Sequence, residues 1–159
     1  MPLPRRQHLQ RIPVWLPLEQ PVIYFITACA ADRQPVWRDP RTVRVTVTSL
    51  QALAARWEWD ALKLCLMPDH IHLLVAPLRE REQDLSAFIR GWKASVTRQL
   101  GRAIWQAEFH DRLLRSDEKL DAQWEYIRFN PVRAGLCAEP EDYPYSGTPK
   151  EILEHLGKA

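Results

Sequence analysis

Two apolar, strand-like runs joined by a short turn constrain the fold of this chain more than any other feature. Residues 61–67 and 71–76 are separated by Pro68-Asp69, a pair typical of turns, so we expect a strand–turn–strand hairpin. Side chains alternate between the two faces along a strand, so His70 and His72 point to one face and the apolar residues that alternate with them point to the other. The hairpin therefore predicts the centre of a sheet that is apolar on one side and carries two imidazoles on the other.

Strands and helices alternate along the rest of the chain in a recognisable order. Periodicity and turn residues predict a strand over 22–27, a helix from Asp39-Pro40, the hairpin, a helix over 85–100 that ends at Gly101, a strand over 104–114, and a last helix that begins at 116–118 and ends near Asn130. This order predicts a split βαβ arrangement: a four-stranded antiparallel sheet with two helices on one face. The other face is then free to carry a site.

We expect a single domain. Residues 1–20 are rich in proline and arginine and predict an extended basic arm, residues 21–146 form the domain, and residues 147–159 form a C-terminal tail. The hydrophobic share of 46% and charged share of 26% are ordinary for a globular protein, and a net charge of +2 does not by itself demand a nucleic-acid partner.

The cysteines and the hydropathy of the chain indicate in which cellular compartment the protein is expected. Three cysteines lie far apart and form no Cys-x-x-Cys pair, which fits a reducing cytoplasm. The longest apolar run, residues 22–31, is too short to span a bilayer. We therefore expect a cytoplasmic protein with no membrane partner.

The last helix carries a second chemical feature, a tyrosine and an asparagine one turn apart. Its apolar residues recur at helical spacing between 120 and 127, and its polar side comprises Lys119, Gln123, Tyr126 and Asn130. If that polar side lies against the sheet face of the histidines, two imidazole nitrogens and one amide oxygen converge on a divalent ion. Each half also has a simpler interpretation: histidines that are merely hydrogen-bonded, and an asparagine that only ends a helix.

Imidazole and amide ligands suit Mg²⁺ or Mn²⁺ acting on a phosphodiester, whereas a structural zinc needs a closed shell of four ligands. A tyrosine hydroxyl, with an ordinary pKa of about 10, becomes a useful nucleophile when a metal polarises the scissile phosphate. The implied reaction is transesterification: Tyr126 attacks the phosphorus, forms a 5′-phosphotyrosine and releases a 3′-OH. Lys119 and Gln123 are candidates for hydrogen bonds to the phosphate or leaving oxygen, on helix phase alone.

These segments resemble a known family. The run Met-Pro-Asp-His-Ile-His-Leu-Leu-Val at 67–75 closely resembles the His–hydrophobic–His (HUH) motif of single-tyrosine transposases. The run Tyr-Ile-Arg-Phe-Asn-Pro-Val-Arg-Ala-Gly-Leu at 126–136 is similar to the tyrosine motif of the branch associated with repetitive extragenic palindromes (REP). Further similar segments at 24–27, 105–112 and 142–144 follow in matching order.

The resemblance implies a ferredoxin-like α+β fold with a C-terminal tyrosine-bearing helix. It implies His70, His72 and Asn130 as metal ligands and Tyr126 as the nucleophile of a metal-dependent strand transferase. The implied partners are single-stranded DNA hairpins, with no small-molecule organic cofactor, and a monomer is favoured over a dimer that exchanges tyrosine helices. Two positions depart from many relatives: Asp69 replaces an asparagine, and Phe129 replaces a smaller or polar residue.

Basic and aromatic side chains are candidates for DNA contacts. The candidate phosphate contacts are Arg5, Arg6 and Arg11 in the arm and Arg90, Lys93, Arg112, Arg115, Arg128 and Arg133 in the domain. Further candidate hairpin contacts are Arg33, Arg38, Arg41 and Arg44. Trp37, Trp92 and Trp105 are candidates for stacking on bases, although helical spacing favours a core position for most tryptophans.

Other function classes remain open. A catalytically silent regulator of the same fold would bind hairpin DNA or RNA, and its binding would survive removal of the metal. An RNA-binding module would stack bases on sheet aromatics such as Tyr24 and Phe25, but histidines occupy the middle strand where further aromatics are wanted. A small-molecule metallohydrolase is disfavoured because no further ligand or general base accompanies the two histidines.

Overall fold

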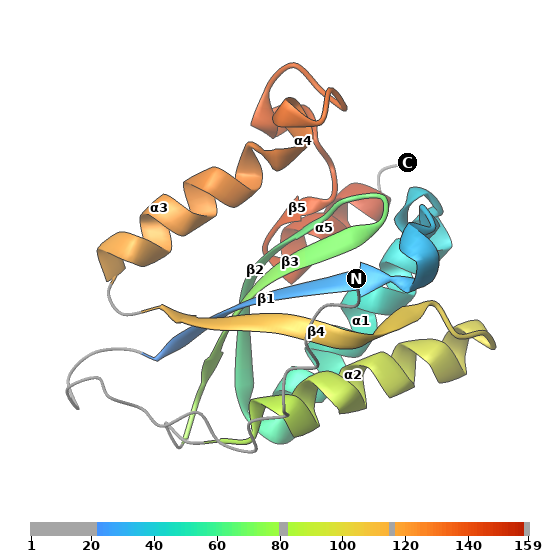
Figure 1. Ribbon diagram of the computed structural model, residues 1–159, viewed down its shortest axis with the longest axis vertical. Coiled ribbons are helices and arrows are strands. Elements are labelled where there is room, and N and C mark those ends of the chain that lie inside the picture. Colours follow the sequence, from blue (N-terminus) through green and yellow to red (C-terminus); the bar gives the residue numbers. More distant parts are fainter. Residues whose placement is uncertain (1–21, 80–82, 115–116, 158–159) are drawn as a thin grey trace, which may run out of the picture.

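The structure, a computed structural model, describes residues 22–79, 83–114 and 117–157, with the backbone alone over 110–114 and 117–119. The predicted arm and its arginines, the side chains of Lys119 and Arg112, and all of Arg115 lie outside the described residues. An antiparallel sheet of five strands in the order β4-β1-β3-β2-β5 forms the frame (Figure 1). The strands are β1 (Ile23–Ala30), β2 (Trp59–Leu66), β3 (His70–Pro77), β4 (Trp105–Leu114) and β5 (Ser146–Gly147).

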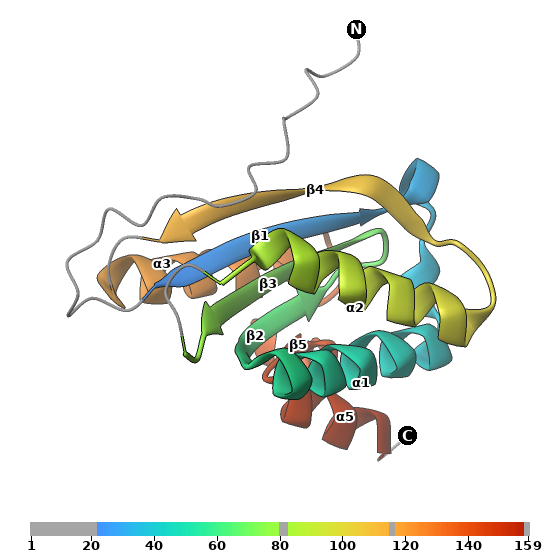
Figure 2. The same cartoon turned by 90° about the horizontal axis from the view of Figure 1, so that it is seen from below.

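Two long helices cover one face of this sheet, and a third lies over the other face (Figure 2). The helices are α1 (Pro40–Trp57), α2 (Leu85–Leu100), α3 (Asp117–Arg128), α4 (Asn130–Arg133) and α5 (Pro149–Gly157), with short 3₁₀ turns η1 (Ala31–Arg33), η2 (Val36–Arg38) and η3 (Pro140–Asp142). The ferredoxin-like prediction is confirmed, with one addition. Strand β5 has two residues and pairs with β2, and a strand so short leaves no periodicity to detect.

Helix α1 forms although its valines and threonines favour strands. Asp39 begins it by accepting hydrogen bonds from the Arg41 amide and the Thr42 hydroxyl, and Pro40 supplies a preset first turn. The Thr46 hydroxyl bonds back to the Thr42 carbonyl, so its polarity is satisfied inside the interface. Burial of one face against the sheet outweighs the local propensity.

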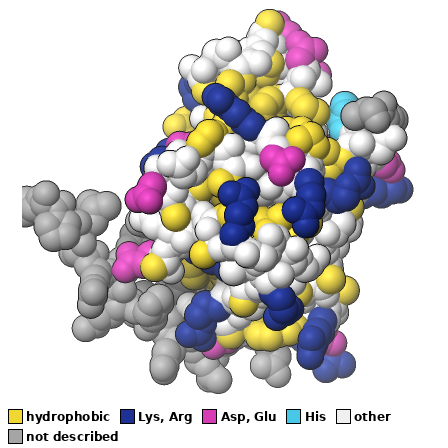
Figure 3. Space-filling model, turned by 90° about the vertical axis from the view of Figure 1, so that its right-hand side faces the viewer, with side chains coloured by type: hydrophobic (Ala, Val, Ile, Leu, Met, Phe, Trp, Pro, Cys, Tyr) yellow, Lys and Arg dark blue, Asp and Glu magenta, His cyan; other side chains and the backbone are white. Residues whose placement is uncertain are grey.

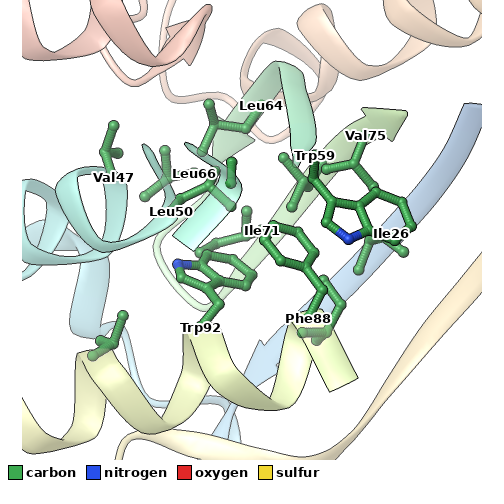
Figure 4. Packing of buried hydrophobic residues seen from close by; sticks show 14 of the residues in the cluster. Ile26, Val47, Leu50, Trp59, Leu64, Leu66, Ile71, Val75, Phe88 and Trp92 are labelled. Carbon is green, nitrogen blue, oxygen red and sulfur yellow. The ribbon is translucent and has the colours of Figure 1, made fainter. Parts of the chain in front are cut away.

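The main core lies between the sheet and α1 and α2. From α2, Phe88 and Trp92 point into it, and Trp59 of β2 stacks on Phe88 with ring centroids 5.2 Å apart (Figure 4). Trp37 and Trp92 are buried, and each indole donates to Thr46. Their predicted alternative role, stacking on DNA bases, is therefore wrong, because the core holds both rings.

The C-terminal segment belongs to the same core. Ile152 and Leu156 of α5 are buried among the residues that line α1 and β2. The predicted boundary between residues 146 and 147 therefore does not mark an edge of the packed domain. Within the described residues, no helix is both long and apolar enough to cross a membrane.

Candidate active site

Strand β3 presents the two histidines as the alternation predicts. His70 and His72 lie on one face with ring centroids 4.8 Å apart, while Ile71 and Leu73 are buried in the main core on the other. The pairing of β1 with β3 places Thr27 opposite His72. The two rings therefore lie side by side over the face of the sheet that α3 covers.

Both rings are held through Nδ1. His70 Nδ1 lies 2.7 Å from the Asp69 carboxylate, and His72 Nδ1 lies 3.1 Å from the Thr27 hydroxyl. A carboxylate only accepts, so a neutral His70 donates from Nδ1 and keeps a lone pair on Nε2. A hydrogen bond from Nδ1 to Thr27 would leave the same lone pair on His72. Metal-binding histidines are oriented in this way by outer partners.

Asp69 is itself fixed. Arg33 Nε donates to its second carboxylate oxygen at 2.9 Å. Burial tends to raise the pKa of Asp69, but the hydrogen bonds from His70 and Arg33 outweigh it, and the pKa is lowered. Asp69 therefore places a negative charge directly behind His70. The sequence singled out this position but did not indicate the pairing with Arg33.

His72 is neutral at physiological pH. Burial lowers its pKa to about 4, and electrostatic interactions with His70 and Arg133 act in the same direction. A neutral imidazole keeps a lone pair that can bind a metal.

Asn130 approaches the histidines from the helical side. Helix α3 ends at Arg128 and α4 begins at Asn130, since Pro131 disfavours helical geometry in the residue before it. Across a separation of 60 residues, the Asn130 side-chain amide nitrogen lies 3.4 Å from His70 Nε2. A half-turn of the amide would present its oxygen, a metal ligand, at the same point.

The donor set does not supply the closed shell of four ligands that a structural zinc needs. Among the described residues there is no cluster of three or more His, Cys, Asp or Glu side chains that could hold a metal. Two imidazoles and one amide leave positions open for phosphate oxygens.

Tyr126 lies beside this group on α3. The apolar side of the helix docks on the sheet, with Ile127 buried against Cys65 and Leu74 and with Trp124 packed at the edge of the same cluster. The polar side therefore does not lie flat on the histidine face, as the convergence of ligands assumed. The structure brings Asn130 to His70 and leaves Tyr126 61% exposed, with the Arg133 guanidinium over its ring.

Lys93 is not a surface cation. It is buried, and its ammonium donates to the carbonyls of Gln106 and Glu108 on β4 while it faces the rings of Trp105 and Phe109. Burial lowers the pKa of Lys93 to about 8. The prediction that Lys93 contacts DNA is therefore wrong, because the interface between α2 and β4 encloses it.

The other predicted site residues differ in solvent exposure and in the contacts that they already make. Arg90 is exposed and Gln123 is half-buried. Arg128 forms ion pairs with Glu125 and Glu141. Trp105 is half-buried and packs on Trp37 and Trp92.

Exposed arginines gather near the His70 end of the sheet. They are Arg33, Arg38, Arg41 and Arg44, which come from η1, η2 and the first turns of α1. Backbone bonds from Ala30 to Asp69 and from Trp37 to Pro68 hold this segment against the β2–β3 turn. Figure 3 shows several Lys and Arg side chains on the side of the molecule toward which β1 and this turn point.

The strand aromatics that an RNA-binding module would need are engaged. Tyr24 is buried and packs at a tilt on Trp59, and Phe25 stacks on His72 with centroids 5.4 Å apart. Neither ring is presented as an open stacking platform.

Two curated proteins are similar to this chain in sequence. A relative from Haemophilus influenzae, named as a REP-associated tyrosine transposase, is 27% identical over 149 residues and covers 84% of each chain. The REP-associated tyrosine transposase of Escherichia coli is 28% identical over 92 residues, covering 57% of this chain and 55% of its own.

Solved structures agree on the fold. A REP-associated tyrosine transposase bound to a REP hairpin superimposes with a TM-score of 0.70 at 21% identity, covering 86% of this chain and 82% of that one. A Deinococcus radiodurans protein described as a transposase gives a TM-score of 0.51 at 18% identity, covering 66% and 87%.

The sequence model of the family described as "Transposase IS200 like" matches residues 20–123, which is more than half of the chain. The matched range contains both histidines and ends before Tyr126. With His70 and His72 side by side on β3 and a match over most of the sheet, the chain belongs to the IS200-like transposase family.

Proposed function

We propose that this protein is a metal-dependent transposase that cleaves single-stranded DNA at hairpins through a covalent 5′-phosphotyrosine. The approach of Asn130 to His70 carries the proposal, because it joins the helix of the tyrosine to the oriented histidine pair. The relatives named as REP-associated tyrosine transposases, one of them bound to a REP hairpin, support the substrate class.

His70, His72 and Asn130 would hold Mg²⁺ or Mn²⁺, which when bound withdraws electron density from a phosphodiester oxygen. Tyr126 supplies the nucleophile, and its exposure lets a DNA strand reach it. Its hydroxyl oxygen bonds to phosphorus and loses its proton, the bond from phosphorus to the 3′ oxygen breaks, and that oxygen takes up a proton as a 3′-OH. The phosphodiester energy is kept in the covalent link, so a second 3′-OH can reverse the step.

The exposed arginines of η1, η2 and α1 suit the backbone of the hairpin. Arg41 and Arg44 lie in the first turns of α1, where the helix dipole already carries partial positive charge and disfavours further cations. A bound polyanion would offset that repulsion, and such binding weakens as salt rises.

A covalent-trapping assay tests the proposal. End-labelled single-stranded hairpins are incubated with wild type, Tyr126→Phe and Tyr145→Phe, each with Mn²⁺ or EDTA, and resolved on a denaturing gel. We expect a labelled adduct with wild type and with the Tyr145→Phe control in Mn²⁺ alone, and none with Tyr126→Phe. Hairpin binding that survives EDTA without any adduct would overturn the proposal in favour of a regulator.

A further inference from the structure

We propose that Arg133 is a positioning residue that holds the ring of Tyr126 ready for attack and does not bind the hairpin backbone. This inference rests on the proposed function and assigns Arg133 a task different from the phosphate contact that the sequence predicts.

Tyr126 needs a contact that restricts its side chain to one rotamer. Tyr126 is 61% exposed near the end of α3, and fixing an exposed side chain in one rotamer costs conformational entropy. The Arg133 guanidinium carbon lies 4.1 Å from the ring centroid, well inside the range of a cation–π contact. Its Nη2 also donates to the backbone carbonyl of Tyr126 at 2.7 Å. The hydrogen bond to the Tyr126 carbonyl therefore fixes the guanidinium beside the ring, and the cation–π contact restrains the ring in turn.

The break between α3 and α4 creates this arrangement. The Tyr126 carbonyl lies in the last turn of α3, where helix carbonyls lack intrahelical partners and arginine side chains often bind them. After the break the chain continues helically, since the Arg133 amide donates to the Phe129 carbonyl at 3.0 Å. Arg133 thus follows Tyr126 by seven residues, two turns along one face with Asn130 between them.

Arg128 is a matched control on the same stretch of chain. It too lies over an aromatic ring, that of Phe129, at 5.1 Å. Its guanidinium, however, is held by Glu125 at 2.7 Å and by Glu141 at 3.0 Å. Removing Arg128 therefore takes away an arginine from the helix end without touching the tyrosine.

The kinetic test compares Arg133→Ala, Arg133→Lys and Arg56→Ala with wild type. Arg56 is an exposed arginine in the last turn of α1 and serves as the control for activity. Single-turnover adduct formation is measured in Mn²⁺ at saturating labelled hairpin, and hairpin affinity is measured separately in EDTA. For Arg133→Ala we expect the rate constant to fall between about ten- and a hundredfold, because reaction geometry is lost, with Kd unchanged within about twofold. Arg133→Lys should recover part of the rate, and Arg56→Ala should resemble wild type.

A second readout does not depend on cleavage. In protein carrying ¹³C-labelled tyrosine, the Tyr126 ring signals are assigned by their loss in Tyr126→Phe. In Arg133→Ala those signals should shift and average between rotamers, while the other tyrosine signals stay in place. In Arg128→Ala, the matched control, the Tyr126 signals should not move. If wild type forms no adduct the proposed function fails, and the tyrosine signals alone then decide whether Arg133 holds the ring.

Two results would overturn the inference. One is a rise in Kd that matches the loss of rate in Arg133→Ala, which would make the residue a phosphate contact. The other is a Tyr126 ring whose signals are the same with and without Arg133.

Discussion

At the scale of single residues, Asp69 gives the histidine pair a property that asparagine could not. Its carboxylate accepts from His70 Nδ1 at 2.7 Å and is held from behind by Arg33 at 2.9 Å. A negative charge behind an imidazole raises its basicity and fixes its tautomer, which strengthens a metal–nitrogen bond. The structure thus assigns a role to a position that the sequence marked only as a departure.

Replacing that carboxylate should weaken metal binding. In Asp69→Asn we expect the Mn²⁺ affinity to fall by about ten- to a hundredfold, since the amide orients His70 without the charge. Titration calorimetry of the purified protein measures it. Asp60→Asn, an exposed aspartate on β2, is the control and should not change the affinity. Equal affinities for all three proteins would show that the charge of Asp69 does not act on the ion.

His72 makes stability depend on pH in the absence of metal. Its pKa is about 4 in the folded chain, below the ordinary 6.5, so between these values the unfolded chain binds a proton that the folded chain does not. Stability must therefore fall as the pH drops from about 6.5 to about 4, by at most about 3 kcal/mol, and then level off for this group.

Urea unfolding in EDTA at several pH values checks this, with His72→Gln as the comparison. As the pH falls, the unfolding free energy of wild type should decrease by more than that of His72→Gln, which lacks the titrating group. Curves that stay parallel from pH 7 to pH 4 would rule out this role for His72.

At the scale of elements, the periodic segments could be predicted and the contacts of α3 could not. The hairpin, the helix begun by Asp39 and the break before Pro131 follow from local rules and are observed. Lys93 shows where residue type misleads. Lys93 follows Ile89 by four residues and so lies on the buried side of α2. Because lysine is charged, the sequence predicted a surface position for it.

The approach of Asn130 to His70 and the stacking of Arg133 on Tyr126 depend on how α3 docks. Helix periodicity shows which side of α3 is apolar, but not the angle or depth at which that side packs. The site could thus be predicted as a set of residues from the motifs, but not as a geometry.

Helix α3 docks on the sheet largely through Ile127. This side chain is 1% exposed and packs on β2 and β3. Removing most of its side chain should cost about 2–5 kcal/mol of local packing, and we expect α3 to open before the rest of the molecule. Hydrogen exchange followed segment by segment should then speed up in α3 and α4 of Ile127→Ala and stay slow in α1 and α2.

Ile152→Ala is the matched control, because Ile152 is equally buried but in the main core. It should speed exchange in α1 and α5 and not selectively in α3. Uniform acceleration in both variants would mean that α3 opens only with global unfolding.

At the scale of the whole molecule, the sheet separates two apolar clusters. The main core with α1, α2 and α5 makes the scaffold, and the smaller cluster on the other face seats the helix of the tyrosine. The histidines lie on the side of the smaller cluster, and their strand is anchored by the larger one. This division explains how one face can carry chemistry while the other supplies stability.

We predict that each chain supplies its own tyrosine, because α3 packs on the sheet of the same chain. Trp124 lies 4.9 Å from the Lys63 ammonium, Arg128 pairs with Glu141, and Asn130 reaches His70, all within one chain. A helix-swapped dimer would have to re-form each of these contacts between two copies.

Complementation between two inactive variants separates these arrangements. In a mixture of His72→Ala and Tyr126→Phe, exchange of helices would unite an intact histidine pair with an intact tyrosine in some dimers. With the tyrosine supplied in cis, no such site can form, so we expect the mixture to give no more hairpin adduct than either variant alone. Recovery of adduct in the mixture, with a dimer on size-exclusion chromatography, would show that the nucleophile comes from a second copy.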